Sequence, residues 1–127
     1  MLVQRQPFDR PYIDRTPEEP GIYIIYDLAC PIYVGRSGCN IRRRLQTHHS
    51  GSGNRNVAMA MRIGAGSSLT FRYCLLSKSE ARQVEGALIQ ELGAAEYANL
   101  RREQIPDDPE GWESGVMIAK SDRRLPR

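Results

Sequence analysis

A single acidic residue stands inside the apolar stripe of a predicted helix. The helix is expected over residues 77–93, because Ser77 and Glu80 match a capping box and Gly93 matches a C-terminal glycine. At 100° per residue, Glu85 falls within the stripe formed by Ala81, Val84, Leu88 and Leu92. A buried carboxylate without a partner is costly. We therefore expect Glu85 to be hydrogen-bonded, paired with an arginine in a structural ion pair, or bound to a cation.

Two tyrosines come together if the segments that carry them form a hairpin. Residues 21–26 and 30–35 are rich in β-branched and aromatic residues and predict two strands. With a three-residue loop between them, Tyr23 faces Tyr33 directly across the ladder, on the same side of the sheet. Taken alone, the two phenols could simply form a cross-strand aromatic pair worth less than about 1 kcal/mol.

The next predicted helix combines basic and apolar positions. It runs over residues 40–49, with Asn40 as its N-cap. One face is formed by Ile41, Leu45 and His48. Arg44 lies at the flank of that face, whereas Arg43 points to the opposite side. The planar guanidinium of an arginine stays protonated and suits phosphate oxygens, whereas His48 taken alone is typical of an ordinary helix-face histidine.

Basic residues gather in one part of the chain. Residues 28–79 contain eight Lys and Arg and no Asp or Glu, although the whole chain has a net charge of only +3. Such a stretch predicts a cationic surface for a polyanion such as nucleic acid. The alternative is a solvated basic face without a partner. The residues expected to grip phosphates rather than to read bases are Arg36, Arg42, Arg43, Arg55 and Arg62.

The remaining elements complete a small domain, and the length of 127 residues predicts only one. A third strand is expected over residues 68–76, with one face formed by Leu69, Phe71, Tyr73 and Leu75. A short helix is expected over residues 56–63. Four prolines in the first 20 residues predict an irregular leader. The predicted fold is α/β (α+β), with a small three-stranded, mostly antiparallel sheet flanked by helices.

Several classes of protein are disfavoured. No apolar run approaches the ~18–20 residues of a membrane-spanning helix, and the first residues lack the apolar stretch of a secretory signal. A cytoplasmic protein with no membrane partner is therefore expected. Three cysteines without a C-x-x-C pair argue against a disulfide framework and against a zinc finger. Phosphate-loop and dinucleotide fingerprints are absent.

The order of these motifs resembles the GIY-YIG nuclease family. Gly21-Ile22-Tyr23 is followed ten residues later by Tyr33-Val34-Gly35, which is similar to the paired signature of that family. The basic run that begins at Asn40 is similar to the one on the family's next helix. Glu85 and Asn99 match its glutamate and asparagine.

The resemblance implies a GIY-YIG-like nuclease domain over residues 20–103. It leaves an irregular leader over residues 1–19 and a C-terminal extension over residues 104–127.

The resemblance also implies roles for the charged residues. Glu85 would bind one Mg²⁺ or Mn²⁺, and a single carboxylate is enough because Mg²⁺ keeps most of its waters. Arg44 would stabilise the negative charge that develops on the phosphate. The gap from Gly35 to Arg44 is one residue longer than in compared members of the family. Arg43 therefore remains a second candidate, although the helix phase prefers Arg44.

The resemblance also implies roles for the uncharged residues that match the family. Tyr23 would be the general base for the attacking water, as is proposed for the family. Tyr33 and His48 would orient water and phosphate, or His48 could share the role of base. Asn99 would brace the region of Glu85, and Gly35 would let backbone approach backbone near the site.

The function implied by the resemblance is that of a divalent-metal-dependent DNA endonuclease, a phosphodiester hydrolase that leaves 5′-phosphate and 3′-hydroxyl ends. A homodimer or a partner protein could supply the second cut or the specificity. The alternative from another class is a non-catalytic nucleic-acid-binding module that uses the same basic surface. RNA is a weaker third possibility as substrate.

Overall fold

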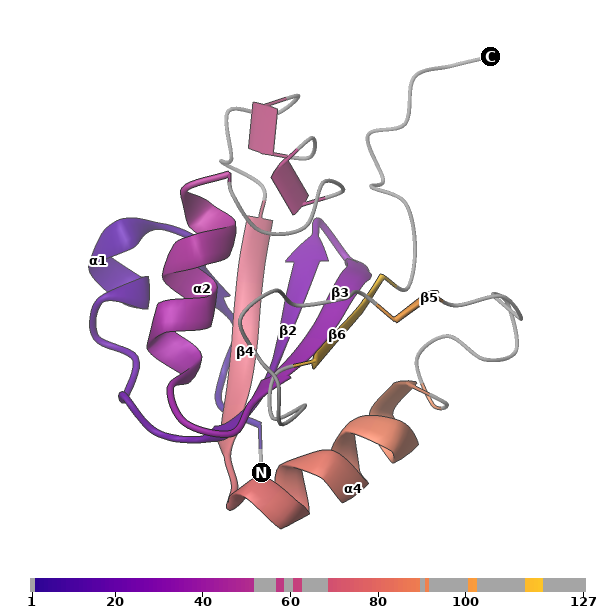
Figure 1. The fold of residues 1–127 in the computed structure, drawn as a ribbon. Helices are drawn as coiled ribbons and strands as arrows, with labels where there is room; N and C mark the ends of the chain where they lie inside the picture. Colours follow the sequence, from indigo (N-terminus) through magenta and orange to yellow (C-terminus); the bar gives the residue numbers. More distant parts are fainter. Residues whose placement is uncertain are drawn as a thin grey trace.

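The computed structural model describes residues 2–51, 57–58, 61–62, 69–89, 91, 101–102 and 114–117. These residues form a sheet with helices on both of its faces (Figure 1). The strands are β1 (Gln6–Pro7), β2 (Gly21–Asp27), β3 (Cys30–Ser37), β4 (Leu69–Leu75), β5 (Arg101–Arg102) and β6 (Ser114–Met117). The helices are α1 (Arg10–Ile13), α2 (Ile41–His49) and α4 (Lys78–Ile89).

The sheet is larger than the three strands expected from the sequence. Its strand order among the described residues is β1-β4-β2-β3-β6-β5, and every ladder is antiparallel. The three expected strands form its centre, with β2 between β3 and β4. The added strands are short, from two to four residues, so they carry little periodicity in the sequence. The predicted α+β class with flanking helices is confirmed.

The hairpin of β2 and β3 has a different register from the one predicted. Its loop contains two residues rather than three, because Asp27 still pairs with Cys30. Leu28 takes the left-handed conformation that a tight turn requires, with φ of 56°. The register also shifts between Ile25 and Tyr26. As a result Tyr23 pairs with Gly35, and the predicted pairing of Tyr23 with Tyr33 is wrong.

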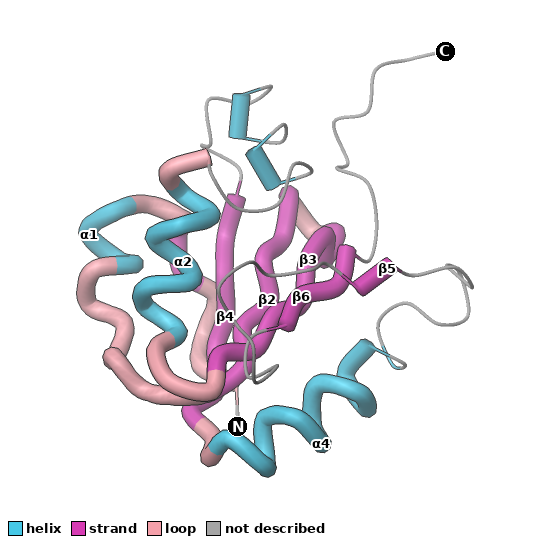
Figure 2. Tube along the Cα trace, viewed as in Figure 1, coloured by secondary structure: helices cyan, strands magenta, loops and turns pink. Residues whose placement is uncertain are grey.

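The two faces of the sheet are covered by different helices (Figure 2). On one face, Tyr23 and Tyr33 belong to a core that also contains Ile13 of α1 and Leu45 of α2. On the other face, Ile22 packs with Ala81 and Val84 of α4, and Ile24 and Val34 pack with Leu88. This division follows from strand alternation, since neighbouring residues point to opposite faces.

Residues 2–19, expected to form an irregular leader, contain two short regular elements that pack onto the domain. β1 pairs with β4, and α1 lies beside α2 (Figure 1). Phe8 and Ile13 are buried in the same core as the two tyrosines. The prolines do not prevent this, because Pro11 occupies the first turn of α1, where its missing N–H costs no hydrogen bond. The leader is therefore an integral part of the fold.

The predicted helix starts are confirmed. Asn40 caps α2, and its side chain accepts a hydrogen bond from the Arg43 N–H at 3.0 Å. Before α4, the Ser77 N–H donates to the Glu80 carboxylate at 3.2 Å, and the Glu80 N–H donates to the Ser77 hydroxyl at 3.3 Å. This reciprocal pair is a capping box. The predicted C-terminal glycine, Gly93, lies outside the described residues.

Two further expectations are met in part. β4 buries Leu69 and Phe71 as predicted, but Leu75 is exposed and Cys74 is buried on the α4 side. Of the short helix predicted over residues 56–63, the described positions 57–58 and 61–62 are helical.

In the described part of the chain, no helix has both the length and the apolarity to cross a membrane.

Candidate active site

Tyr23, Tyr33 and His48 form one aromatic cluster between the sheet and α2. The rings of Tyr23 and Tyr33 are stacked with centroids 6.2 Å apart, and the His48 ring meets Tyr33 edge-on at 4.6 Å. The Tyr23 hydroxyl lies 3.0 Å from His48 Nε2, within hydrogen-bond distance. All three side chains are fully buried. The prediction that both phenols share one face is therefore confirmed, although they are diagonal rather than direct neighbours.

Gly35 makes room for the Tyr23 ring. A Cβ atom at this position would overlap the Cζ and Oη atoms of Tyr23. The close approach is thus between a side chain and the strand, whereas the sequence suggested an approach of two backbone segments. Because Gly35 has no side chain, the Tyr23 hydroxyl can lie directly over β3 and reach His48.

Burial keeps His48 neutral. Removal from water lowers the pKa of His48 from its usual 6.5 to about 3, and the positive charge of Arg44 acts in the same direction. At neutral pH the imidazole therefore carries one proton, on either of its nitrogens. A neutral imidazole can accept the Tyr23 proton at Nε2 or donate its own Nε2–H to the phenol oxygen. Arg44, which is partly buried, lies close enough to influence this ring.

Glu85 is buried on the other face of the sheet, as the apolar stripe of its helix predicts. Its carboxylate is 1% exposed, and Oε1 lies 3.8 Å from Nη1 of Arg36. Arg36 follows Gly35 on β3 and pairs with Ile22, so it points to the face that α4 covers. The expected arginine partner of Glu85 is therefore Arg36.

The candidate residues form two groups that meet at β3. Tyr23, Tyr33 and His48 lie on the α2 face, and Glu85 lies with Arg36 on the α4 face. The two groups are separated by the thickness of the sheet, which at Gly35 is backbone alone. Their convergence on one phosphate, as implied by the family resemblance, stays a prediction.

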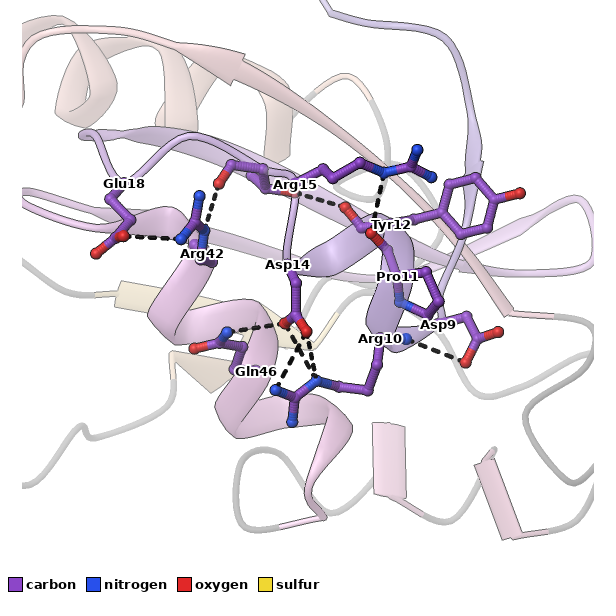
Figure 3. Close-up of polar contacts among 10 residues, drawn as sticks. Asp9, Arg10, Pro11, Tyr12, Asp14, Arg15, Glu18, Arg42 and Gln46 are labelled. Carbon is purple, nitrogen blue, oxygen red and sulfur yellow. Dashed lines mark hydrogen bonds and ion pairs between the residues drawn. The ribbon is translucent and has the colours of Figure 1, made fainter.

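The arginines expected to bind phosphates differ in their surroundings. Arg42 holds the leader to α2: its Nε donates to the Thr16 carbonyl at 2.6 Å, and its Nη1 lies 2.7 Å from the Glu18 carboxylate (Figure 3). By contrast, the side chains of Arg43 and Arg62 are exposed. Arg55 lies outside the described residues, as does Asn99.

The leader contributes residues that the sequence interpretation overlooked. Asp14 accepts a hydrogen bond from the Gln46 amide of α2 at 2.9 Å, and Figure 3 shows this contact beside the Arg10–Asp14 ion pair. The ring of Phe8 also lies 5.4 Å from that of His49. These contacts fix α2, which carries Arg44 and His48. The signal in the sequence was the presence of acidic side chains in the leader, two of which, Asp14 and Glu18, contact the basic helix α2.

Glu85 offers the type of ligand that Mg²⁺ prefers. Carboxylate oxygens are hard donors, and Mg²⁺ is commonly held by one or two carboxylates together with several waters. Among the described residues no group of three or more His, Cys, Asp or Glu side chains could hold a metal ion together, so Glu85 alone would supply the protein ligand. One carboxylate fits a Mg²⁺ that keeps most of its waters.

Comparisons with known proteins identify the domain. The family model of the GIY-YIG catalytic domain matches residues 19–98. Similar solved structures include the GIY-YIG N-terminal endonuclease domain of UvrC from Thermotoga maritima bound to magnesium, its catalytic divalent cation. It is 28% identical, covers 65% of this chain and 88% of that chain, and has a TM-score of 0.52.

A point mutant of the same UvrC domain, bound to its catalytic divalent cation, is also similar. It is 30% identical, covers 65% of this chain and 87% of that chain, and has a TM-score of 0.50. No match was found among the curated proteins.

The family match spans more than half of the 127 residues. The matched residues include Tyr23, Tyr33 and Glu85, together with Arg44 and His48 of α2. The chain therefore belongs to the GIY-YIG nuclease family.

Proposed function

We propose that this chain is a divalent-metal-dependent DNA endonuclease that leaves 5′-phosphate and 3′-hydroxyl ends. The observation that carries the proposal is the Tyr23 hydroxyl held 3.0 Å from a neutral His48 imidazole. Titratable groups with a strongly shifted pKa and a specific charged neighbour, such as His48 beside Arg44, cluster at functional sites. The magnesium-bound UvrC domain supports the metal dependence by analogy.

Tyr23 would act as the general base. His48 can donate its Nε2–H to the phenol oxygen, and the positive charge of Arg44 acts on the imidazole. The phenolate takes a proton from water while the water oxygen attacks phosphorus. The bond from phosphorus to the 3′ oxygen breaks, and that oxygen leaves with a proton from solvent.

Positive charge would stabilise the reacting phosphate. Arg44 would face the developing negative charge with a guanidinium that remains protonated. Glu85 would hold the cation, which when bound polarises a phosphate oxygen and neutralises the leaving oxygen. Because one site cuts one strand, a second copy of the chain or a partner protein would supply the second cut.

Complete burial of the aromatic cluster favours a second candidate function. Tyr23, Tyr33 and His48 are fully buried and pack with Leu45 and other core residues. A cluster of this kind could serve stability alone. The chain would then be a non-catalytic nucleic-acid-binding module that uses exposed arginines such as Arg43.

Incubation with DNA separates the two candidates. Supercoiled plasmid and single-stranded DNA are each mixed with the protein in the presence of Mg²⁺ or of EDTA. The variant Glu85→Ala tests the proposed ligand, and Glu91→Ala removes an exposed carboxylate further along the chain as a matched control.

The nuclease predicts cutting that requires Mg²⁺, is abolished in Glu85→Ala and persists in Glu91→Ala. Its products can be sealed by a DNA ligase, which needs 5′-phosphate and 3′-hydroxyl ends. Salt-sensitive DNA binding without cleavage would instead support the binding module. RNA in the same assay tests the third substrate.

A further inference from the structure

The ion pair of Arg36 and Glu85 occupies the position where the proposed cation would bind. Both side chains are largely removed from water, with Arg36 12% exposed and Glu85 1% exposed. A carboxylate buried to this extent needs hydrogen bonds or a positive partner. In the described part of the chain, Arg36 is a positively charged partner of Glu85.

The contact between Arg36 and Glu85 is longer than a direct hydrogen-bonded ion pair. The distance from Arg36 Nη1 to Glu85 Oε1 is 3.8 Å, whereas the Arg42–Glu18 pair that fixes the leader has a distance of 2.7 Å. A direct charge-assisted hydrogen bond spans about 2.7–2.9 Å. The Arg36 contact is therefore the looser of the two, although it is the more buried.

We propose that Arg36 is an exchangeable counterion of Glu85, which a divalent cation displaces when it binds. This inference rests on the proposed function, because it takes Glu85 as the metal ligand. Arg36 follows Gly35 on β3 and points to the α4 face, where Glu85 also lies. A guanidinium released from Glu85 stays on that face and is available to a phosphate that binds beside the cation.

Displacement of Arg36 couples the binding of the substrate phosphate to the binding of the cation. A phosphate that binds Arg36 draws the guanidinium away from Glu85 and so raises the affinity of Glu85 for the cation. By thermodynamic reciprocity, the cation raises the affinity for the phosphate by the same factor. Arg36 therefore limits metal loading in the absence of substrate. It acts as a positioning residue for the carboxylate, and its effect is measurable without catalysis.

Titration calorimetry with Mn²⁺ at pH 8, without DNA, tests the exchange. The proteins compared are wild type, Arg36→Gln and Glu85→Gln, with Arg10→Gln as the control. Arg10 likewise pairs with a carboxylate, that of Asp14, but on an exposed helix of the leader. An opposite charge in contact changes the proton affinity of a carboxylate by roughly 10- to 1000-fold. We therefore expect Arg36→Gln to bind Mn²⁺ at least about tenfold more tightly than wild type.

The inference predicts the same Mn²⁺ affinity for Arg10→Gln as for wild type, and no binding at this site in Glu85→Gln. If Arg36→Gln folds poorly, Arg36→Met keeps more of the apolar stem of the side chain and is tested in the same way. Thermal unfolding gives a second readout, in which Mn²⁺ raises the melting temperature of the Arg36 variant more than that of wild type.

Unchanged or weaker Mn²⁺ binding in the Arg36 variants, with Glu85-dependent binding in wild type, would overturn the exchange and leave the metal site intact. Absence of Glu85-dependent binding in wild type and in the Arg36 variants would overturn the metal site itself. The two failures are thus distinguishable.

Discussion

Replacement of Gly35 by alanine places a methyl group where the Tyr23 ring lies. A Cβ atom there would overlap the Cζ, Oη and Cε2 atoms of Tyr23, so the ring has to move. Tyr23 is fully buried and stacked on Tyr33, and it has no open space to enter without displacing its neighbours. Overpacking of this kind costs about 1–3 kcal/mol.

Movement of the Tyr23 ring also breaks its contact with His48. The 3.0 Å contact joins two fully buried groups, and a buried polar group left without its partner costs about 1–3 kcal/mol. Since the two costs overlap in part, we expect Gly35→Ala to lower the free energy of unfolding by about 2–4 kcal/mol. This is a large share of the ~5–15 kcal/mol of an ordinary domain.

Gly86 provides the matched control for this substitution. It is exposed in α4, and a Cβ atom added there meets nothing within 4 Å. Because glycine weakens a helix interior, Gly86→Ala should raise the free energy of unfolding by about 0.5–1 kcal/mol. Urea denaturation followed by circular dichroism measures both variants. A Gly35→Ala protein within about 0.5 kcal/mol of wild type would refute the packing argument.

Four further predictions concern α2. The pKa of His48 is about 3 in the folded chain and near 6.5 unfolded, so the unfolded chain takes up the proton first and stability falls below pH 6.5. The free energy of unfolding should be about 2 kcal/mol lower at pH 5 than at pH 7, and urea titrations of His48→Phe should lack this loss. Arg42→Gln should cost about 1–2 kcal/mol of stability in thermal melts, because Arg42 binds the Thr16 carbonyl. Exposed Arg43, when changed to Gln, should leave the melting temperature unchanged and reduce the salt dependence of DNA binding by about one unit of slope. Asn40→Ala removes the N-cap and should cost about 1 kcal/mol in the same melts, and an unchanged melting temperature would contradict the cap.

Local signals in the sequence predicted the helices well. The cap at Asn40 and the capping box of Ser77 and Glu80 depend on residues three positions apart, so the chain needs no tertiary contact to specify them. The buried position of Glu85 followed in the same way from the 3.6-residue period of its helix. These features could therefore be predicted without knowledge of the fold.

Features that depend on distant contacts were harder to predict. The hairpin register depends on Leu28, which adopts a left-handed conformation without being glycine or asparagine. The regular structure of the leader depends on Phe8 and Ile13, which pack into a core built by residues far along the chain. Likewise, Arg36 was expected on a DNA-binding surface, and only the packing of α4 against β3 brings it to Glu85.

The proposed function requires groups on two faces of the sheet to serve one reaction. A double-mutant cycle on single-turnover DNA cleavage, with Tyr23→Phe, Glu85→Gln and the double variant, tests it most directly. If both side chains act on the same phosphate, each single variant is slow and the double variant is hardly slower than the worse of the two. Rate losses that multiply would show that Tyr23 and Glu85 contribute independently, and would contradict the expected coupling between them.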